Sequence, residues 1–274
     1  MHFDAYRATI PAQPSMIEHI FKEEFGGYGT ASPHKNYRHA LTFGAVKARL
    51  NWGGHNLHPF VDVQGEWSHD VAQVIRSKFP QHRVSRADAC IDFTGGRPEF
   101  KRLSSALVKV AEKWGVQTRL ISSPSDHDKG QTLYLGSRSS EVMLRLYEKG
   151  KQLQEVKGIT PPDADLLRFE IEVKPNKADR KRLLSRSAPE ALAGFSRWSV
   201  QASSLVTGSV IPFAPRVSDR RTDAQKALEH MFRQYGGQAS LFVRESGEKA
   251  FRSMMEAFIV RSIEDATQEK PENS

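Results

Sequence analysis

The chain has 274 residues, with 40 lysines and arginines against 32 acidic residues, so its formal net charge is +8. This length allows one large domain, or a main domain with a smaller one, and it provides enough chain for a core. The positive charge indicates a polyanionic partner, and nucleic acid is the commonest one.

The single cysteine, Cys90, excludes an intrachain disulfide and a cysteine-based zinc site, which fits a reducing compartment. The first residues, MHFDAYRATIP, lack the apolar run of a secretory signal, and no segment approaches the length of a membrane span. No GxxxxGK[ST] sequence occurs, which excludes a P-loop ATPase. We therefore expect a cytoplasmic protein with no membrane partner.

Alternation of apolar and polar residues with a period of two marks the predicted strands. They cover residues 2–10, 37–67 as several strands, 83–93, 117–122, 131–135, 142–149 and 166–174. Apolar residues at helical spacing mark the predicted helices. They cover residues 16–25, 68–79, 100–114, 176–208, 223–235 and 248–266.

This order of strands and helices, repeated along the chain, predicts an α+β fold. We expect a mostly antiparallel sheet with helices packed on one face, a pattern that allows for an internal duplication. Residues 1–208 form the predicted main domain, and residues 209–222, with prolines and charges, form a linker or loop. Helices over residues 223–266 are expected to pack on the main domain, and residues 267–274 to be a disordered tail.

The segment around Tyr147 is the most informative part of the chain. Arg145, Tyr147 and Lys149 alternate there with Leu144 and Leu146, which puts the tyrosine and the two cations on one face of a strand. A protonated phenol is a poor nucleophile, and neighbouring cations favour the phenolate, so this face is suited to attack a phosphate. The alternative is an ordinary amphipathic sheet with a surface tyrosine.

Acidic residues are depleted in strands, yet two of the predicted strands carry two each on one face. They are Asp88 and Asp92 in RADACIDF, and Glu170 and Glu172 in RFEIEVK. Carboxylate oxygens suit Mg²⁺ or Mn²⁺, and such an ion would polarise a phosphate. The alternative is cross-strand pairing with arginines, which stabilises a sheet by about 0.2–1 kcal/mol per pair.

A basic segment follows the last predicted strand and indicates contact with a DNA backbone. Its candidate residues are Lys174, Lys177, Arg180, Lys181 and Arg182. Arg138 and Arg168 are two further candidates for DNA contact. The alternative for the basic segment is solvated charge on a helix.

Several segments, taken together, resemble the replication initiation factor family called Rep_trans. They are FDAYRATIP, VDVQGEWS, RADACIDF, TLYLGSRSS, RLYEKGKQ, LLRFEIEVKP and LEHMFRQYGG, in this order over about residues 1–260. Members of this family include initiators of rolling-circle plasmids, replication proteins of filamentous phages and related relaxases. The resemblance implies a sheet distantly like that of HUH endonucleases, but without their two histidines.

The resemblance also implies a metal-dependent nicking-closing endonuclease. Tyr147 would attack an origin phosphodiester in single-stranded DNA or an extruded hairpin, leaving a 5′-phosphotyrosine link and a 3′-hydroxyl primer. Arg145 and Lys149 would hold the phosphate oxygens or lower the pKa of the phenol. The divalent ion would be bound by the strand carboxylates, which are Asp88, Glu170, Asp92 and Glu172. A homodimer and a host helicase are further implied partners.

Three alternatives remain open from the sequence. A conjugative relaxase would use the same chemistry on another target. A non-enzymatic origin-binding protein would share the basic charge but need neither a metal nor a tyrosine. A metal-dependent nuclease that uses water would cut DNA without remaining attached to it. Tyr134, on a neighbouring predicted strand, is the reserve nucleophile.

Overall fold

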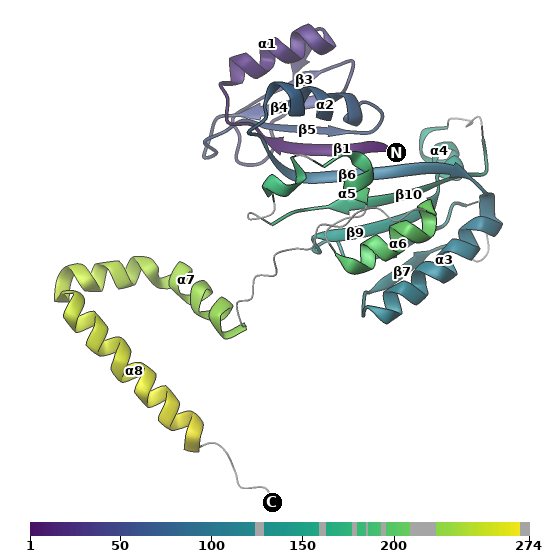
Figure 1. Ribbon diagram of the computed structural model, residues 1–274. Coiled ribbons are helices and arrows are strands. Elements are labelled where there is room, and N and C mark those ends of the chain that lie inside the picture. The colour runs from purple at the N-terminus through teal and green to yellow at the C-terminus, as the bar shows by residue number, and fades with distance from the viewer. Residues whose placement is uncertain are drawn as a thin grey trace, which may run out of the picture. The chain divides into compact units, whose positions relative to one another are not determined.

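The computed structural model describes residues 1–123, 129–158, 163–176, 180–184, 186–192, 196–208 and 223–268. The chain divides into two compact units, Met1–Pro215 and Arg216–Ser274. The first unit contains the sheet and its helices (Figure 1). The second contains α7 (Asp223–Ser246) and α8 (Glu248–Gln268). The predicted packing of these two helices on the main domain remains a prediction.

Ten strands form one sheet, and every strand pair in its described part is antiparallel. The spatial order is β2-β3-β4-β5-β1-β6-β10-β9-β8-β7. The strands are β1 (His2–Thr9), β2 (Tyr28–Thr30), β3 (His39–Phe43), β4 (Ala48–Trp52), β5 (Phe60–Gln64), β6 (Arg83–Thr94), β7 (Thr118–Ile121), β8 (Thr132–Leu135), β9 (Val142–Glu148) and β10 (Leu166–Val173).

Helices cover one face of this sheet, as the sequence predicts. They are α1 (Pro14–Phe25), α2 (Ser68–Lys78), α3 (Gly96–Lys113), α5 (Ala188–Leu192) and α6 (Arg197–Thr207). Their apolar residues, such as Phe21, Ile75 and Leu103, join those of the strands in one buried core. Figure 1 shows α3, α5 and α6 in front of the strands. The α+β prediction is therefore confirmed.

The sheet consists of two halves with the same topology, a duplication that the order of elements in the sequence allows for. The first half runs β1-α1-β2-β3-β4-β5-α2, and the second runs β6-α3-β7-β8-β9-β10-α5, with α4 (Lys149–Lys157) inserted before β10. In each half the first strand lies beside the fifth, and β1 and β6 pair at the centre of the sheet.

The side chains of the central strands divide between the two faces because successive residues of a strand point to opposite sides. Phe169 and Ile171 of β10 are fully buried in the core beneath the helices. Arg168 and Glu170, which alternate with them, lie on the opposite face. We call this second face, which also carries charged residues of β1, β6 and β9, the polar face.

The predicted strand 142–149 ends one residue earlier, because Lys149 begins α4. The turn is fixed at Glu148, whose carboxylate accepts hydrogen bonds from Arg97 Nε and the backbone N–H of Gln131, each at 2.8 Å. Gly150 then passes so close to Ala164 that a Cβ atom would lie 2.4 Å from its carbonyl oxygen. The sequence patterns did not predict α4.

The predicted helical segment 176–208 is broken into short pieces. A 3-10 helix covers Arg180–Leu183, and α5 and α6 follow. Ser196 starts α6 as a new helix, because its side chain and that of Ser199 cap each other's backbone N–H groups. In contrast, α7 continues past the predicted end at Tyr235, although two glycines there cost about 1 kcal/mol each relative to alanine.

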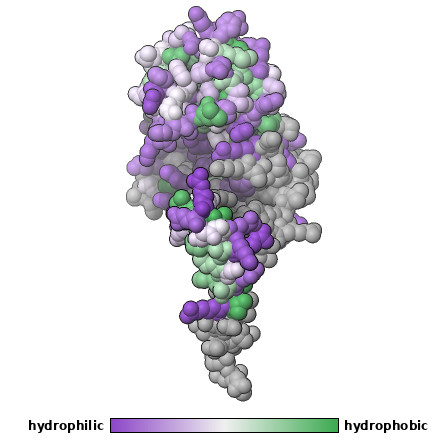
Figure 2. All heavy atoms as spheres, turned by 90° about the vertical axis from the view of Figure 1, so that its left-hand side faces the viewer, coloured by the Kyte–Doolittle hydropathy of each residue, from purple (hydrophilic) through white to green (hydrophobic). Residues whose placement is uncertain are grey.

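The predicted linker, residues 209–222, lies outside the described residues. The face of the first unit that Figure 2 shows is largely hydrophilic, with scattered apolar residues between the polar ones. A search of the described helices for a stretch of sufficient length and apolar character to cross a lipid bilayer found none.

Candidate active site on the polar face

Four neighbouring strands, β1, β6, β10 and β9, bring the predicted catalytic residues together. In the register of β10, Arg168 lies opposite Asp92 on one side and Tyr147 on the other. Glu170 lies opposite Cys90 and Arg145 in the same way. The tyrosine, the acids and the arginines therefore form adjacent rows across the polar face.

Tyr147 points into this charged region and not into the apolar core. Its residue is 7% exposed, and its hydroxyl donates a hydrogen bond of 3.3 Å to Glu170 Oε2. Lys149 Nζ lies 5.6 Å from the centre of the phenol ring, although Lys149 belongs to α4. Lys149 thus lies near the phenol from α4 and not from the strand face that the sequence predicted, and the catalytic role of the three residues stays a prediction.

The pKa of Tyr147 is raised, whereas the sequence-based hypothesis was that neighbouring cations favour the phenolate. Burial is the largest cause of the increase, and the negative charge of Glu170 adds to it. Arg168 and Arg145 act in the predicted direction, but their effect is smaller than that of burial. The phenol therefore needs a proton acceptor, and the hydrogen-bonded Glu170 is the nearest one.

Arg145 connects the acids of the polar face. Its guanidinium pairs with Glu170 Oε1, and its Nη2 lies 3.5 Å from Asp88 Oδ2. The Nε atom of Arg145 is buried and has no hydrogen-bond partner among the described residues. An unpaired buried donor is costly, so this N–H is a natural contact for an oxygen atom of a bound phosphate.

Two of the acids have raised pKa values. Burial is the main cause for Glu170, whose pKa rises to about 7, with Arg145 opposing the increase and the charge of Asp88 adding to it. Burial also raises the pKa of Asp88, against the opposing effect of Arg86. Burial therefore outweighs the neighbouring arginines at both acids, and a bound cation would further favour their ionised form.

All four predicted metal ligands already pair with cations of the protein. Arg86 Nε lies 2.8 Å from Asp88 Oδ1, and its Nη2 lies 2.8 Å from Glu172 Oε2. Asp92 accepts hydrogen bonds of 2.5 and 2.6 Å from Arg168. Glu170 pairs with Arg145, and Glu172 also pairs with Lys174. Cross-strand ion pairing, the alternative considered from the sequence, is therefore present at every one of these acids.

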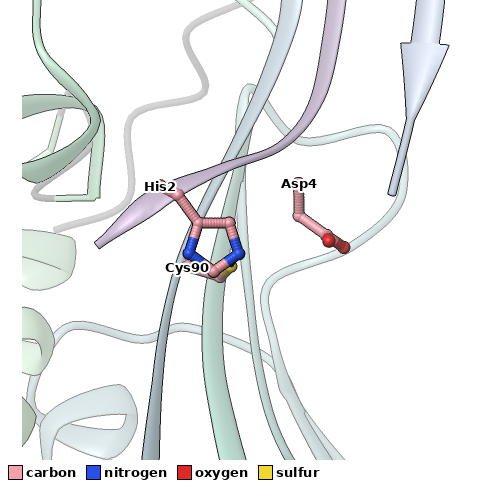
Figure 3. Close-up of side chains that lie close together, drawn as sticks. All are labelled: His2, Asp4 and Cys90. Carbon is pink, nitrogen blue, oxygen red and sulfur yellow. Dashed lines mark hydrogen bonds between the residues drawn. The ribbon is translucent and has the colours of Figure 1, made fainter. Parts of the chain in front are cut away.

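A different group of possible ligands lies beside these acids. The ligand atoms of His2, Asp4 and Cys90 are all within 4.8 Å of one another (Figure 3). His2 Nε2 lies 3.1 Å from Cys90 Sγ, and burial lowers the pKa of His2, which favours its neutral imidazole. This mixed nitrogen, oxygen and sulfur set suits Zn²⁺ better than Mg²⁺, so a single cysteine does not exclude a zinc ligand set that contains it, contrary to the expectation from the sequence. Asp4 is shared, because it also accepts a hydrogen bond of 2.7 Å from Arg168 Nη1.

The predicted DNA-contact residues are not equivalent in the structure. Arg168 is 7% exposed and contacts Asp4 and Asp92, so it orders the acids and presents little free charge. Arg138 is exposed, and its carbonyl oxygen accepts a hydrogen bond of 2.8 Å from Lys174 Nζ. Buried Arg180 Nε has no hydrogen-bond partner in the described part of the chain. Lys177 lies outside the described residues, and the side chains of Lys181 and Arg182 do so too.

Sequence reasoning missed two members of the charged rows, Asp4 and Arg86, as site residues. Asp4 is the one acid of β1, and acids are depleted in strands, so it was a usable signal. Arg86 lies between two carboxylates only because β6 and β10 pair in the observed register. That register cannot be read from the spacing within one strand.

Two comparisons with known proteins found similar ones. The family model described as replication initiation factor (Rep_trans) matches residues 83–192, the segment that contains Asp88, Tyr147 and Glu170. The predicted family resemblance is therefore confirmed. A solved structure of the rolling circle replication initiator protein from Geobacillus stearothermophilus is similar at a TM-score of 0.49 and 17% identity, over 80% of this chain and 88% of that chain. A search of curated proteins gave no match.

Proposed function

We propose, on the premise that residues 83–192 belong to the Rep_trans family, that this chain nicks one strand of an origin through Tyr147 and so initiates rolling-circle replication. The observation that carries the proposal is the contact of 3.3 Å between the Tyr147 hydroxyl and Glu170, on a charged face of the sheet. A tyrosine with an adjacent proton acceptor is the arrangement that nucleophilic catalysis requires.

In the proposed reaction, Glu170 takes the proton of the Tyr147 hydroxyl as its oxygen attacks the scissile phosphorus. The bond from phosphorus to the 3′-oxygen breaks, and the leaving oxygen takes a proton from water. The new ester joins the 5′-phosphate to Tyr147 and leaves a free 3′-hydroxyl that can prime synthesis. Because one phosphoester replaces another, the step can be reversed without ATP. The unpaired Nε–H of Arg145 would hold an oxygen of the phosphate.

A divalent ion is part of the proposal. Asp88 fits it best, because it is an oxygen ligand next to Arg145 and burial raises its pKa, whereas Glu170 is needed as the proton acceptor. When bound, the ion would polarise the phosphate and stabilise its developing charge. Binding would require Arg145 to release Asp88, which would free part of its guanidinium for the DNA.

The proposal is tested by incubating the protein with a labelled single-stranded origin oligonucleotide and Mg²⁺ or Mn²⁺. We expect a covalent protein–DNA adduct that is lost in Tyr147→Phe. Tyr134→Phe is the matched control, since Tyr134 is half-buried on the neighbouring strand β8 and lies opposite Arg145. An adduct of equal yield from Tyr147→Phe would assign the nucleophile to another residue.

A non-enzymatic origin-binding protein is the second candidate. The ion pairs at all four predicted metal ligands favour it, since a site filled by its own arginines needs no metal. Such a protein would bind the oligonucleotide equally well with and without a divalent ion and would form no adduct. A conjugative relaxase would form the same adduct, on a transfer origin.

A further inference from the structure

The two halves of the sheet place corresponding residues at the same register positions. Arg49 of β4 lies opposite Asp62 of β5, as Arg145 of β9 lies opposite Glu170 of β10. By the same correspondence, Asn51 occupies the position of Tyr147. The N-terminal half of the polar face is therefore a second copy of the site, with a different set of side chains.

This second copy lacks the group that the proposed reaction needs. Asn51 is fully buried, and its Oδ1 accepts a hydrogen bond of 2.9 Å from the backbone N–H of His34. Its Nδ2 donates a bond of 3.4 Å to the carbonyl oxygen of Phe60. An amide held in this way is no nucleophile, so this half cannot cleave DNA as Tyr147 is proposed to do. We therefore consider whether it binds DNA.

The charges of the N-terminal half differ from those beside Tyr147. Its carboxylate, Asp62, is contacted by Arg7 Nε at 2.8 Å and by His34 Nε2 at 3.0 Å. Arg49 is half-buried on the same face and has no hydrogen-bond or ion-pair partner among the residues that the structure describes. Cations therefore outnumber acids here, whereas the arginines beside Tyr147 all pair with carboxylates.

An aromatic platform lies next to these cations. The ring of Tyr37 stacks on that of Phe60, with centroids 6.0 Å apart and an interplanar angle of 19°. His34 packs against Phe60 edge-on at 5.8 Å. The loop that carries Tyr37 is held in place by Gly54, which has φ +84° and comes so close that a Cβ atom would lie 2.5 Å from the carbonyl oxygen of Asn36.

We propose that the N-terminal half of the polar face binds a single-stranded DNA segment that adjoins the phosphate cleaved at Tyr147. This inference rests on the proposed function. A basic surface beside stacked aromatic rings, here with Arg49 unpaired, is the combination that binds single strands without reading their sequence. Arg49 and Arg7 would contact phosphates, and a base would stack on Tyr37. Five strand spacings separate β4 from β9, which is about 24 Å along one continuous sheet.

The test measures binding of oligothymidylates of about 4 to about 16 nucleotides at several salt concentrations. All variants are made in a Tyr147→Phe background, so that no covalent step contributes. We expect affinity to increase with length. Arg49→Gln should lower the affinity for the longest oligonucleotide about ten-fold and reduce the salt slope by about one. Tyr37→Leu should lower it about ten-fold without changing that slope.

Lys109→Gln is the matched control, because Lys109 is exposed on α3, which covers the other face of the sheet. It should bind like the background protein. Thermal unfolding must show that each variant is folded. If Tyr37→Leu is not folded, Arg49→Gln alone tests the inference. The inference is overturned if both folded variants bind all lengths as the control does.

Failure of the inference can be told apart from failure of the proposed function. An adduct that depends on Tyr147, together with normal binding by Arg49→Gln, would leave the proposed function standing and remove the inference. Loss of affinity in Arg49→Gln, without any adduct in the wild-type chain, would support DNA binding by the N-terminal half and remove the proposed nicking function.

Discussion

At the scale of single residues, burial affects both the nucleophile Tyr147 and its proton acceptor Glu170. Burial raises the pKa of the phenol, which protects it from ionising in the absence of DNA. The same burial raises the pKa of Glu170 to about 7, so this carboxyl group is a stronger base than an exposed glutamate. A pKa near the working pH is the property expected of a general base.

The rate of adduct formation should therefore increase with pH through about 7, because Glu170 accepts a proton only when it is ionised. In Glu170→Gln the rate should fall by about 10²–10⁴-fold and lose this pH dependence. The measurement is the initial rate of adduct formation between about pH 6 and about pH 8. A wild-type rate that is flat over this range, or a Gln variant with the same profile, would contradict the role of Glu170.

Arg145 compensates two buried acids, so its removal should destabilise the protein. We expect Arg145→Met to lower the free energy of unfolding by roughly 3 kcal/mol, because Glu170 and Asp88 lose a shared cation. Mn²⁺ should restore part of the loss if the ion binds at these carboxylates. Urea unfolding with and without Mn²⁺ measures both effects.

Arg102→Met is the control for this experiment, since Arg102 pairs with Glu99 on the exposed side of α3. It should leave stability and the response to Mn²⁺ unchanged. If Mn²⁺ stabilises the wild type and Arg145→Met by the same amount, the ion does not bind where Arg145 lies.

At the scale of secondary-structure elements, a buried hydrogen-bond network around Tyr6 joins β1 to α2. Tyr6 of β1 donates a hydrogen bond of 2.7 Å to His82 Nε2, because His82 Nδ1–H is used by the carbonyl oxygen of Phe79 at 2.7 Å. Arg76 of α2 donates to the same Tyr6 oxygen at 3.3 Å and to the carbonyl oxygen of Leu183 at 2.8 Å. This contact ties β1, α2 and the 3-10 helix around the turn that precedes β6.

This contact makes stability depend on pH. Burial lowers the pKa of His82 from 6.5 to about 4, so the unfolded chain binds a proton in a range where the folded chain does not. Stability is therefore complete above about pH 6.5 and is lost as the pH falls toward about 4. Between pH 7.5 and pH 5 the loss should be at most about 2 kcal/mol.

Urea unfolding at these two pH values checks the prediction, and His82→Gln should remove this part of the difference. His19→Gln is the control, because His19 is exposed on α1 with a side chain that is 71% accessible. A pH difference that His82→Gln leaves unchanged would show that other groups cause it.

Most strands could be predicted because alternation is a local property. The segments around Tyr6, Phe169 and Tyr147 alternate between apolar and polar residues over most of their length, and their bounds agree with the prediction to within one or two residues. The start of α4 at Lys149 could not be predicted in this way, because it depends on Arg97 and on the close approach of Ala164, both far away in the sequence.

The whole molecule explains which parts of the site could be foreseen. Alternation placed Tyr147, Asp88 and Glu170 on one face, and the sheet order then made them neighbours. The pair of Arg168 with Asp4 could not be predicted, because these two residues are 164 positions apart in the sequence. The raised pKa of Tyr147 has the same origin, since only the assembled rows of side chains bury its hydroxyl.

The duplication gives the molecule two copies of one sheet with different chemistry. The half with Tyr147 carries more acids, and the half with Arg49 carries an unpaired cation and stacked rings. Ionised side chains are thus distributed unevenly between the two halves of the polar face. We infer that the N-terminal half, with Arg49, holds the DNA strand and that the half with Tyr147 cuts it.

The most direct measurement is mass spectrometry of the proteolysed covalent complex formed with a single-stranded origin oligonucleotide and Mn²⁺. The account predicts one modified peptide, containing Tyr147, with the DNA attached through its 5′-phosphate and a free 3′-hydroxyl on the released fragment. Attachment at any other residue, or cleavage that leaves both DNA ends free of protein, would contradict it.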